Sequence, residues 1–103
     1  MQKVDGLPKL IAAHRRALNA AESLGARLME TDSGESLLIG LCLDAAFAAE
    51  LVARRRVAAA PVTTMREVKL KAAYFKRLMN KDWCELEPAD IRALLRSFAN
   101  VPA

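Results

Sequence analysis

The fold is decided first by residues 7–29, which read LPKLIAAHRRALNAAESLGARLM. Positions at alternating intervals of four and three form a ladder of mostly apolar or small residues: Leu7, Ile11, His14, Leu18, Ala21, Gly25 and Leu28. This spacing places the ladder on a single face of an α-helix. Pro8 suits a first helical turn. We therefore predict a helix from about Pro8 to about Met29 that buries this face.

The second predicted helix, about residues 34–59, is apolar over most of its circumference. Asp32, followed three residues later by Glu35, indicates a capping-box variant at its start. Pro61 closes the helix, because the residue before a proline is disfavoured in the helical region. The polar positions form a narrow stripe: Ser36, Gly40, Asp44, Glu50 and Arg54. So little polar surface predicts a helix that is central in its bundle or buried at an oligomer interface.

Two shorter helices are predicted after this point. Thr64 and Glu67 form a capping box for a helix from Met65 to about Asn80, and Pro88 begins a helix that runs to about Ala99. The expected buried faces are Met65, Val68, Ala72, Phe75 and Met79 in the former and Ile91, Leu94, Leu95 and Phe98 in the latter. A connector over residues 81–87 separates the two helices and holds Trp83 and Cys84.

Composition supports the same fold class. The chain has 103 residues and is 53% hydrophobic, with 20 alanines and 15 leucines but only 9 valines and isoleucines together. Ala and Leu favour helices, whereas β-branched residues favour strands. The sequence predicts one all-α domain over residues 1–103, a bundle of about four helices with a long helical hairpin and two shorter helices. Alanine buries little area, so a homodimer that supplements this thin core is expected.

The net charge of +4 is concentrated in the C-terminal part, where residues 61–103 carry a net +3. Basic side chains of the third predicted helix fall within an arc of about 140° at 100° per residue: Arg66, Lys69, Lys76, Arg77 and Lys81. Tyr74 lies on or near the same side, and Lys71 lies apart. This face is a candidate site for an acidic protein partner, with nucleic-acid binding as the alternative. An ordinary solvated helix face remains the third interpretation.

His14 is the only histidine. Its place on the first ladder, between Ile11 and Leu18, favours a position at the edge of the core or at an interface. The alternative is a phospho-accepting histidine on a helical bundle, as in histidine phosphotransfer domains, which requires an exposed imidazole with cations nearby. Arg15 and Arg16 follow His14, but Ala17 and Leu18 occupy the positions where those domains usually place Lys and Gly.

Other chemistry has no recognisable pattern in the sequence. There is no nucleophile beside a base, no His or carboxylate spacing of a metal site and no glycine-rich phosphate loop. We therefore expect a protein that is not an enzyme and that has no metal and no cofactor. Cys42 and Cys84 match no zinc or redox motif and are expected to be reduced thiols in a cytoplasmic protein. The longest apolar stretch, residues 37–43, is shorter than the ~20 residues that span a bilayer, so no membrane insertion is expected.

One segment resembles a known group of proteins. Residues 60–74, APVTTMREVKLKAAY, are similar to a stretch of short, uncharacterised α-proteobacterial proteins that has Ala-Pro-x-Thr-Thr and then a helix with Lys-Ala-x-Tyr. The resemblance implies a cytoplasmic bacterial protein and transfers no activity and no functional residue. Together these features predict a small, non-enzymatic interaction or regulatory module that self-associates.

Overall fold

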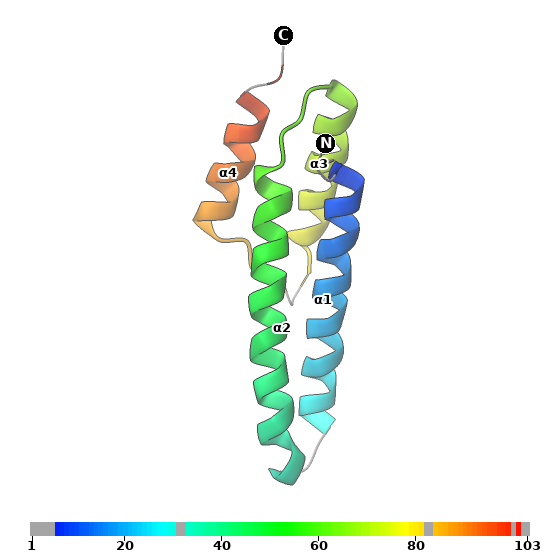
Figure 1. Ribbon diagram of the computed structural model, residues 1–103, viewed down its shortest axis with the longest axis vertical. Coiled ribbons are helices and arrows are strands. Elements are labelled where there is room, and N and C mark those ends of the chain that lie inside the picture. Colours follow the sequence, from blue (N-terminus) through cyan, green and yellow to red (C-terminus); the bar gives the residue numbers. More distant parts are fainter. Residues whose placement is uncertain (1–5, 31–32, 82–83, 100, 102–103) are drawn as a thin grey trace, which may run out of the picture.

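The protein is an all-α bundle, as predicted (Figure 1). The structure, a computed structural model, describes residues 6–30, 33–81, 84–99 and 101. Over these residues it has four helices and no strand: α1 (Leu7–Glu30), α2 (Ser33–Ala59), α3 (Met65–Leu78) and α4 (Pro88–Ala99). Each helix begins and ends within two residues of its predicted bounds. The predicted cap of Asp32 with Glu35, and Trp83, lie outside the described side chains.

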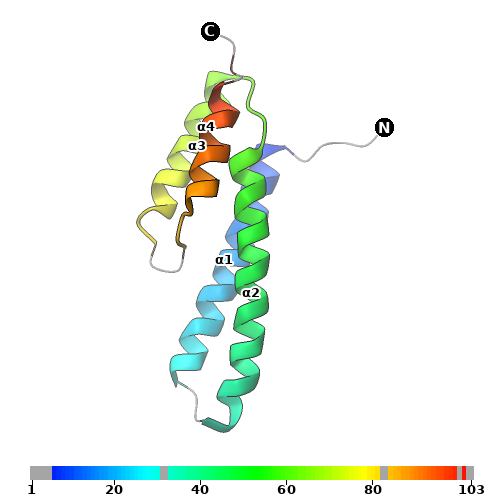
Figure 2. The ribbon, with the colours of Figure 1, turned by 90° about the vertical axis from the view of Figure 1, so that its left-hand side faces the viewer.

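Successive helices run in opposite directions, and α1 with α2 forms a long hairpin. The two shorter helices lie against one half of this hairpin, beside the start of α1 and the end of α2 (Figures 1 and 2). The other half, which holds the α1–α2 turn, extends beyond them. The radius of gyration is accordingly 15.8 Å, against about 13 Å for a compact chain of this length. The hairpin end is therefore a two-helix structure with unpartnered surface.

The core forms where all four helices meet. The ladder of α1 is confirmed, since its buried residues are Leu7, Ile11, His14, Leu18, Ala21 and Gly25. Val57 and Ala58 of α2 and Phe75 and Leu78 of α3 pack in the same cluster. Partly buried residues of α4 cover it: Ala93, Leu94 and Phe98.

The predicted buried face of α3 is confirmed for Phe75 and in part for Val68, and it is wrong for Met65, Ala72 and Met79. Met65 and Met79 are 60% and 72% exposed, and the helix buries Lys71, Tyr74, Phe75 and Leu78. Two of these four residues are polar, and both find hydrogen-bond partners inside the bundle. Hydrophobic periodicity, which treats polar residues as exposed, therefore predicts that Lys71 and Tyr74 lie outside the core. In α4 the prediction is also partly wrong, because Ile91 and Leu95 are exposed while Asp90 and Ser97 are buried.

The start of α3 is capped as the sequence predicts, with one difference. The Thr64 hydroxyl accepts a hydrogen bond from the Glu67 backbone N–H at 3.2 Å. The Glu67 carboxylate reaches back one residue further than in a standard capping box and accepts from the Thr63 N–H at 3.1 Å. The hydrogen bonds from Thr63 hold the pKa of Glu67 below its usual range.

The polar stripe of α2 is divided, because Glu50 and Arg54 are buried while Asp44 is exposed. The apolar residues are divided as well: Ile39, Leu43 and Val57 are buried, whereas Leu37, Leu38 and Leu41 are 60–76% exposed. Gly40 has nothing within 4 Å of a Cβ built on it, so no neighbouring helix of the chain approaches it closely. The segment Ser36–Ala59 is, by length and composition, apolar enough to cross a membrane, with a mean hydropathy of 1.9 over an 18-residue window. The expectation of no membrane insertion depended on the shorter uninterrupted stretch at residues 37–43, which did not identify this segment as a candidate span.

Lys71 ties the end of α2 to α3 and α4. Its fully buried ammonium donates to the Ala58 carbonyl at 2.6 Å, the Ala60 carbonyl at 2.8 Å and the Ser97 hydroxyl at 2.7 Å. The last carbonyls of a helix have no partner within the helix, and here a side chain 11 to 13 residues further along supplies one. Burial lowers the pKa of Lys71 to about 8.

Replacing this ammonium by an apolar group of similar length is expected to destabilise the fold. Lys71→Met leaves buried carbonyl oxygens without a donor, and each costs about 1–3 kcal/mol. We expect the free energy of unfolding, measured by urea denaturation, to fall by about 2–4 kcal/mol. Lys69→Met is the matched control, because Lys69 is exposed on the same helix. Equal losses for the two variants would contradict the role of Lys71.

Candidate functional site

A cluster of polar side chains lies at the centre of the bundle. We refer to it as the buried polar cluster, and its members are His14, Glu50, Arg54, Tyr74, Cys84 and Asp90. All six residues are at most 7% exposed. They come from α1, α2, α3, the α3–α4 connector and α4. The cluster is therefore the point at which the whole fold converges.

His14 bridges two of the other elements. Its Nε2 donates to the Glu50 carboxylate across a distance of 2.7 Å, and its Nδ1 lies 2.5 Å from the Tyr74 hydroxyl. A carboxylate only accepts, so in the neutral imidazole the proton sits on Nε2 and Nδ1 accepts from Tyr74. The ring is fixed in both position and tautomer. This arrangement links α1, α2 and α3 through one side chain.

Arg54 is the positive centre of the cluster. Its guanidinium lies 3.3 Å from Glu50 Oε1, 3.1 Å from Asp90 Oδ2 and 3.2 Å from Glu87 Oε1. It also donates to the backbone carbonyl of Glu85. The contact between Arg54 Nε and Asp90 Oδ2 is an ion pair without hydrogen-bond alignment, since Nε has no hydrogen-bond partner among the described residues. The other carboxylate oxygen, Asp90 Oδ1, also has no hydrogen-bond partner among them. Removing one charge would leave the others buried and uncompensated, which is strongly destabilising.

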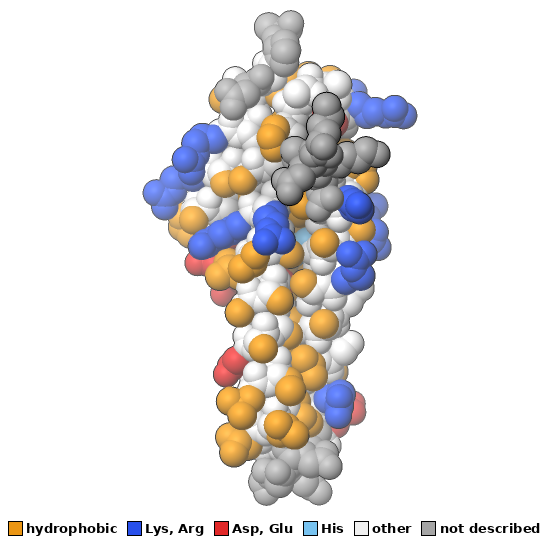
Figure 3. Space-filling model, in the orientation of Figure 1, with side chains coloured by type: hydrophobic (Ala, Val, Ile, Leu, Met, Phe, Trp, Pro, Cys, Tyr) orange, Lys and Arg blue, Asp and Glu red, His pale blue; other side chains and the backbone are white. Residues whose placement is uncertain are grey.

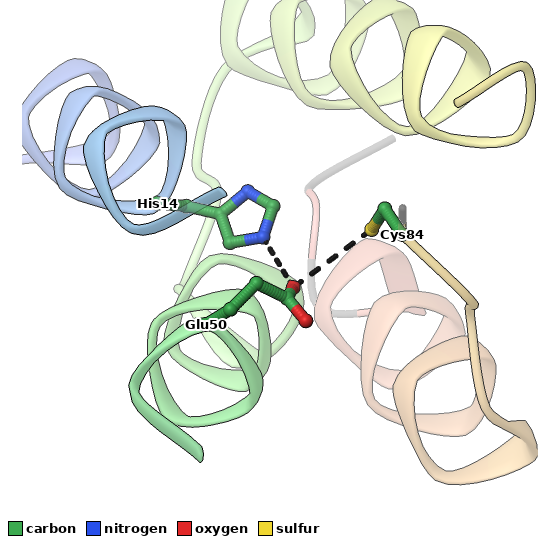
Figure 4. Close-up of side chains that lie close together, drawn as sticks. All are labelled: His14, Glu50 and Cys84. Carbon is green, nitrogen blue, oxygen red and sulfur yellow. Dashed lines mark hydrogen bonds and ion pairs between the residues drawn. The ribbon is translucent and has the colours of Figure 1, made fainter. Parts of the chain in front are cut away.

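Cys84 completes the inner part of the cluster. Its Sγ lies 3.8 Å from Glu50 Oε2 and 3.8 Å from Arg54 Nη1. Burial raises the pKa of the Cys84 thiol. His14, Glu50 and Cys84 each offer a ligand atom, and these atoms lie within 4.8 Å of one another (Figure 4). Within the described part of the chain, they are the residues placed to hold a metal ion.

The burial of His14 bears directly on the two interpretations of its role. The expectation of a histidine in the core is confirmed, since His14 is 0% exposed. The phosphotransfer alternative requires an exposed imidazole, and the buried ring does not meet that requirement. Both ring nitrogens are also engaged by neighbouring side chains.

The candidate anionic-partner face is present in part. The five cations Arg66, Lys69, Lys76, Arg77 and Lys81 are all exposed on or just after α3. Tyr74 is not part of this surface, because its ring is buried and its hydroxyl faces His14. The aromatic residue expected among the cations is therefore a core residue.

A cavity of about 220 Å³ lies between α1 and α3, at one end of this face. Arg15 of α1 and Arg77 and Lys81 on the α3 side line it, with Asn19 and Tyr74. Lys81 also lies 3.6 Å from the Glu22 carboxylate. Three cations around a hollow of this size provide space and charge for an anionic group such as a carboxylate or phosphate.

The sequence did not predict most of the buried polar cluster, because each of its residues gives only a weak signal by itself. The ladder did place His14 inward, and Glu50 with Arg54 has the i, i+4 spacing of a helical ion pair. That spacing is common on solvated helices, so it does not predict burial. Asp90 and Cys84 lie 34 to 40 residues from Glu50 in the sequence. Only tertiary packing brings them beside it.

No family model, curated protein or solved structure matches this chain. The resemblance of residues 60–74 to α-proteobacterial proteins therefore stays a prediction. The functional argument rests on the geometry described above.

The proton on Tyr74 can be followed directly, because the chain has one tyrosine. Burial, with the nearby Cys84 and Glu50, raises the pKa of Tyr74 to about 12, against about 10 in an unfolded chain. The stabilising contribution of this shift is complete below pH 10 and is lost as the pH rises through 12. We expect the near-ultraviolet absorbance of tyrosinate to titrate about two units lower in denaturant than in the native protein. A native midpoint near 10 would contradict the buried hydroxyl, and Tyr74→Phe should abolish the signal.

Proposed function

We propose that this protein is a small, non-enzymatic interaction module that forms a homodimer through the outer face of α2. The observation that supports the proposal is a row of exposed apolar residues at intervals of three and four. We call this row the α2 seam: Leu38, Leu41, Ala45, Ala48 and Val52. Leu37, Cys42 and Ala49 flank it and are also exposed. The spacing is that of the contact positions of a coiled coil.

The location of the α2 seam favours association. It runs along the half of the hairpin that α3 and α4 leave uncovered, and hydrophobic side chains gather at that end of the molecule (Figure 3). Soluble monomers rarely expose a contiguous apolar surface of this kind. Pairing two hairpins along it would complete a four-helix arrangement from two two-helix ends.

The side chains of the α2 seam fit a second copy in antiparallel orientation. With a two-fold axis between residues 46 and 47, the small Ala45 and Ala48 meet at the centre. At each end of the contact, Leu41 packs opposite Val52 of the partner. The small alanines at the centre allow the two helix backbones to approach closely, and the larger residues flank them. A parallel pair would instead bring the exposed Arg55 and Arg56 of both copies together. Antiparallel packing separates these charges and opposes the two helix dipoles favourably.

The oligomeric state tests this proposal. In light scattering at micromolar concentration we expect twice the chain mass of 11.3 kDa. Ala48→Glu places a charge opposite Ala45 of the partner and should give a monomer, because two like charges would lie about 4.5 Å apart along the axis inside an apolar contact. The matched control is Leu95→Glu, since Leu95 is exposed on α4 away from the seam. A wild-type monomer, or association with lipid vesicles instead of self-association, would overturn the proposal.

Cysteine cross-linking tests the orientation in a Cys42→Ala background. In the antiparallel dimer, two copies of position 45 lie within about 5 Å along the axis, whereas two copies of position 38 are about 25 Å apart at 1.5 Å per residue. Ala45→Cys should therefore form an intermolecular disulfide on oxidation, and Leu38→Cys should not. Efficient cross-linking of both would indicate a parallel pair.

A second role is supported by the cations of α3 and the cavity beside them. We infer that this face binds an acidic protein segment, with a carboxylate in the cavity lined by Arg15, Arg77 and Lys81. Nucleic acid remains the alternative, since phosphate satisfies the same cations.

Binding of a polyglutamate peptide and of duplex DNA at matched ionic strength separates these two partners. We expect the peptide to bind at low salt, to weaken as salt rises, and to lose at least tenfold in affinity in Lys69→Glu/Lys76→Glu. Arg92→Glu/Arg96→Glu is the control for net charge, because those two cations lie on α4. Tighter binding of the DNA would favour the nucleic-acid alternative. The absence of both interactions at low salt would contradict this role.

A further inference from the structure

We propose that His14, Glu50 and Cys84 form a zinc site at the centre of the bundle. Their ligand atoms are His14 Nε2, Glu50 Oε2 and Cys84 Sγ, and all three point toward one another from three different elements (Figure 4). This inference is independent of the proposed dimer, because the three residues are buried inside a single chain.

The distances are close to those of a tetrahedral zinc site. With Zn–N and Zn–O near 2.0 Å and Zn–S near 2.3 Å, neighbouring ligand atoms lie about 3.3–3.6 Å apart. Here Nε2 and Oε2 are 2.7 Å apart, and Sγ and Oε2 are 3.8 Å apart. Zinc therefore requires the first pair to open by about 0.6 Å and the second to close by a few tenths of an ångström. The third pair, Nε2 and Sγ, lies within 4.8 Å and closes toward about 3.5 Å in a tetrahedral site.

The neighbouring side chains are arranged as in known metal sites. The Tyr74 hydroxyl faces Nδ1 of His14, so its oxygen can accept a hydrogen bond from Nδ1–H when Nε2 binds a metal. Arg54 lies against Glu50 Oε1, which leaves Oε2 as the oxygen that faces His14 and Cys84. His14 and Glu50 thus have their other polar atom held in place, which orients the ligating atom inward.

Charge balance also favours a dication. The ion pairs around the site join three carboxylates, those of Glu50, Glu87 and Asp90, to two guanidiniums, those of Arg54 and Arg55, which leaves an excess of one negative charge. Zn²⁺ together with a Cys84 thiolate adds one net positive charge and makes the centre neutral. Binding displaces the thiol proton of Cys84, which leaves to solvent, while the imidazole proton moves from Nε2 to Nδ1.

The ligand set identifies the metal class. One nitrogen, one sulfur and one carboxylate oxygen suit zinc, whereas Mg²⁺ and Ca²⁺ take oxygen ligands. Three protein ligands leave a fourth position for water. The ion would join α1, α2 and the α3–α4 connector, so its expected effect is on stability.

Cobalt is the spectroscopic probe for this site, used after dialysis of the whole protein against a chelator. We expect one Co²⁺ per chain, with the visible bands of tetrahedral cobalt and a near-ultraviolet thiolate-to-cobalt charge-transfer band. Zn²⁺ should displace the cobalt and, at a hundredfold excess over its Kd, raise Tm by about 10 °C.

Matched cysteine variants decide the result. Cys84→Ser should lose the thiolate band, while Cys42→Ala should keep it, because Cys42 is exposed on α2. His14→Gln should weaken cobalt binding at least tenfold, with helical circular dichroism before metal addition confirming that the variant is folded. Absence of cobalt binding by the wild type, or a band that follows Cys42, would overturn the proposal.

Discussion

A carboxylate at the centre of a small helical bundle must be neutralised and hydrogen-bonded, and Glu50 meets this requirement with partners from across the fold. One of its oxygens faces His14 and Cys84, and the other faces Arg54. Arg54 in turn draws in Asp90 and the connector before α4. Because an unpaired buried charge costs several kcal/mol, the four helices dock in the arrangement that completes these contacts. The apolar core contributes buried surface around the cluster, whereas the polar contacts of the cluster determine how the four helices align with one another.

The sequence predicted the helices well because their signals are local. The ladder from Leu7 to Gly25, the Thr64 cap and Pro88 each depend on neighbours within a few turns, and all three agree with the structure. The faces of α3 and α4 were harder to predict. Hydrophobic periodicity placed Met65 and Met79 inside and left out Lys71 and Tyr74, since the pattern cannot show that a polar side chain will meet a partner. Those partners, Ala58, Ala60 and His14, lie 11 to 60 residues away.

The same reasoning explains the prediction for the candidate site. His14 was expected in the core from its helical phase, which is correct. All six residues of the candidate anionic-partner face were expected at the surface, which is correct for the five cations and wrong for Tyr74. Glu50 and Arg54 appeared in the sequence as part of the narrow polar stripe of α2. In the structure these two residues are buried, whereas Asp44 of the same stripe is exposed. An amphipathic pattern gives the boundary between two faces, but the ionic partners on α1 and α4 decide which face is inside.

The uneven length of the two helix pairs has a consequence for local opening of the chain. Near the α1–α2 turn, each helix packs against one neighbour, whereas near Lys71 and Arg54 it is held by side chains from three or four elements. Regions with fewer buried contacts open at lower free energy, so backbone amides of α2 around residues 37–45 exchange with solvent before those around residues 50–58. A partner bound along the exposed side would slow exchange in the first region alone. The protein thus combines a rigid half, which maintains the fold, with a more labile half that association would stabilise.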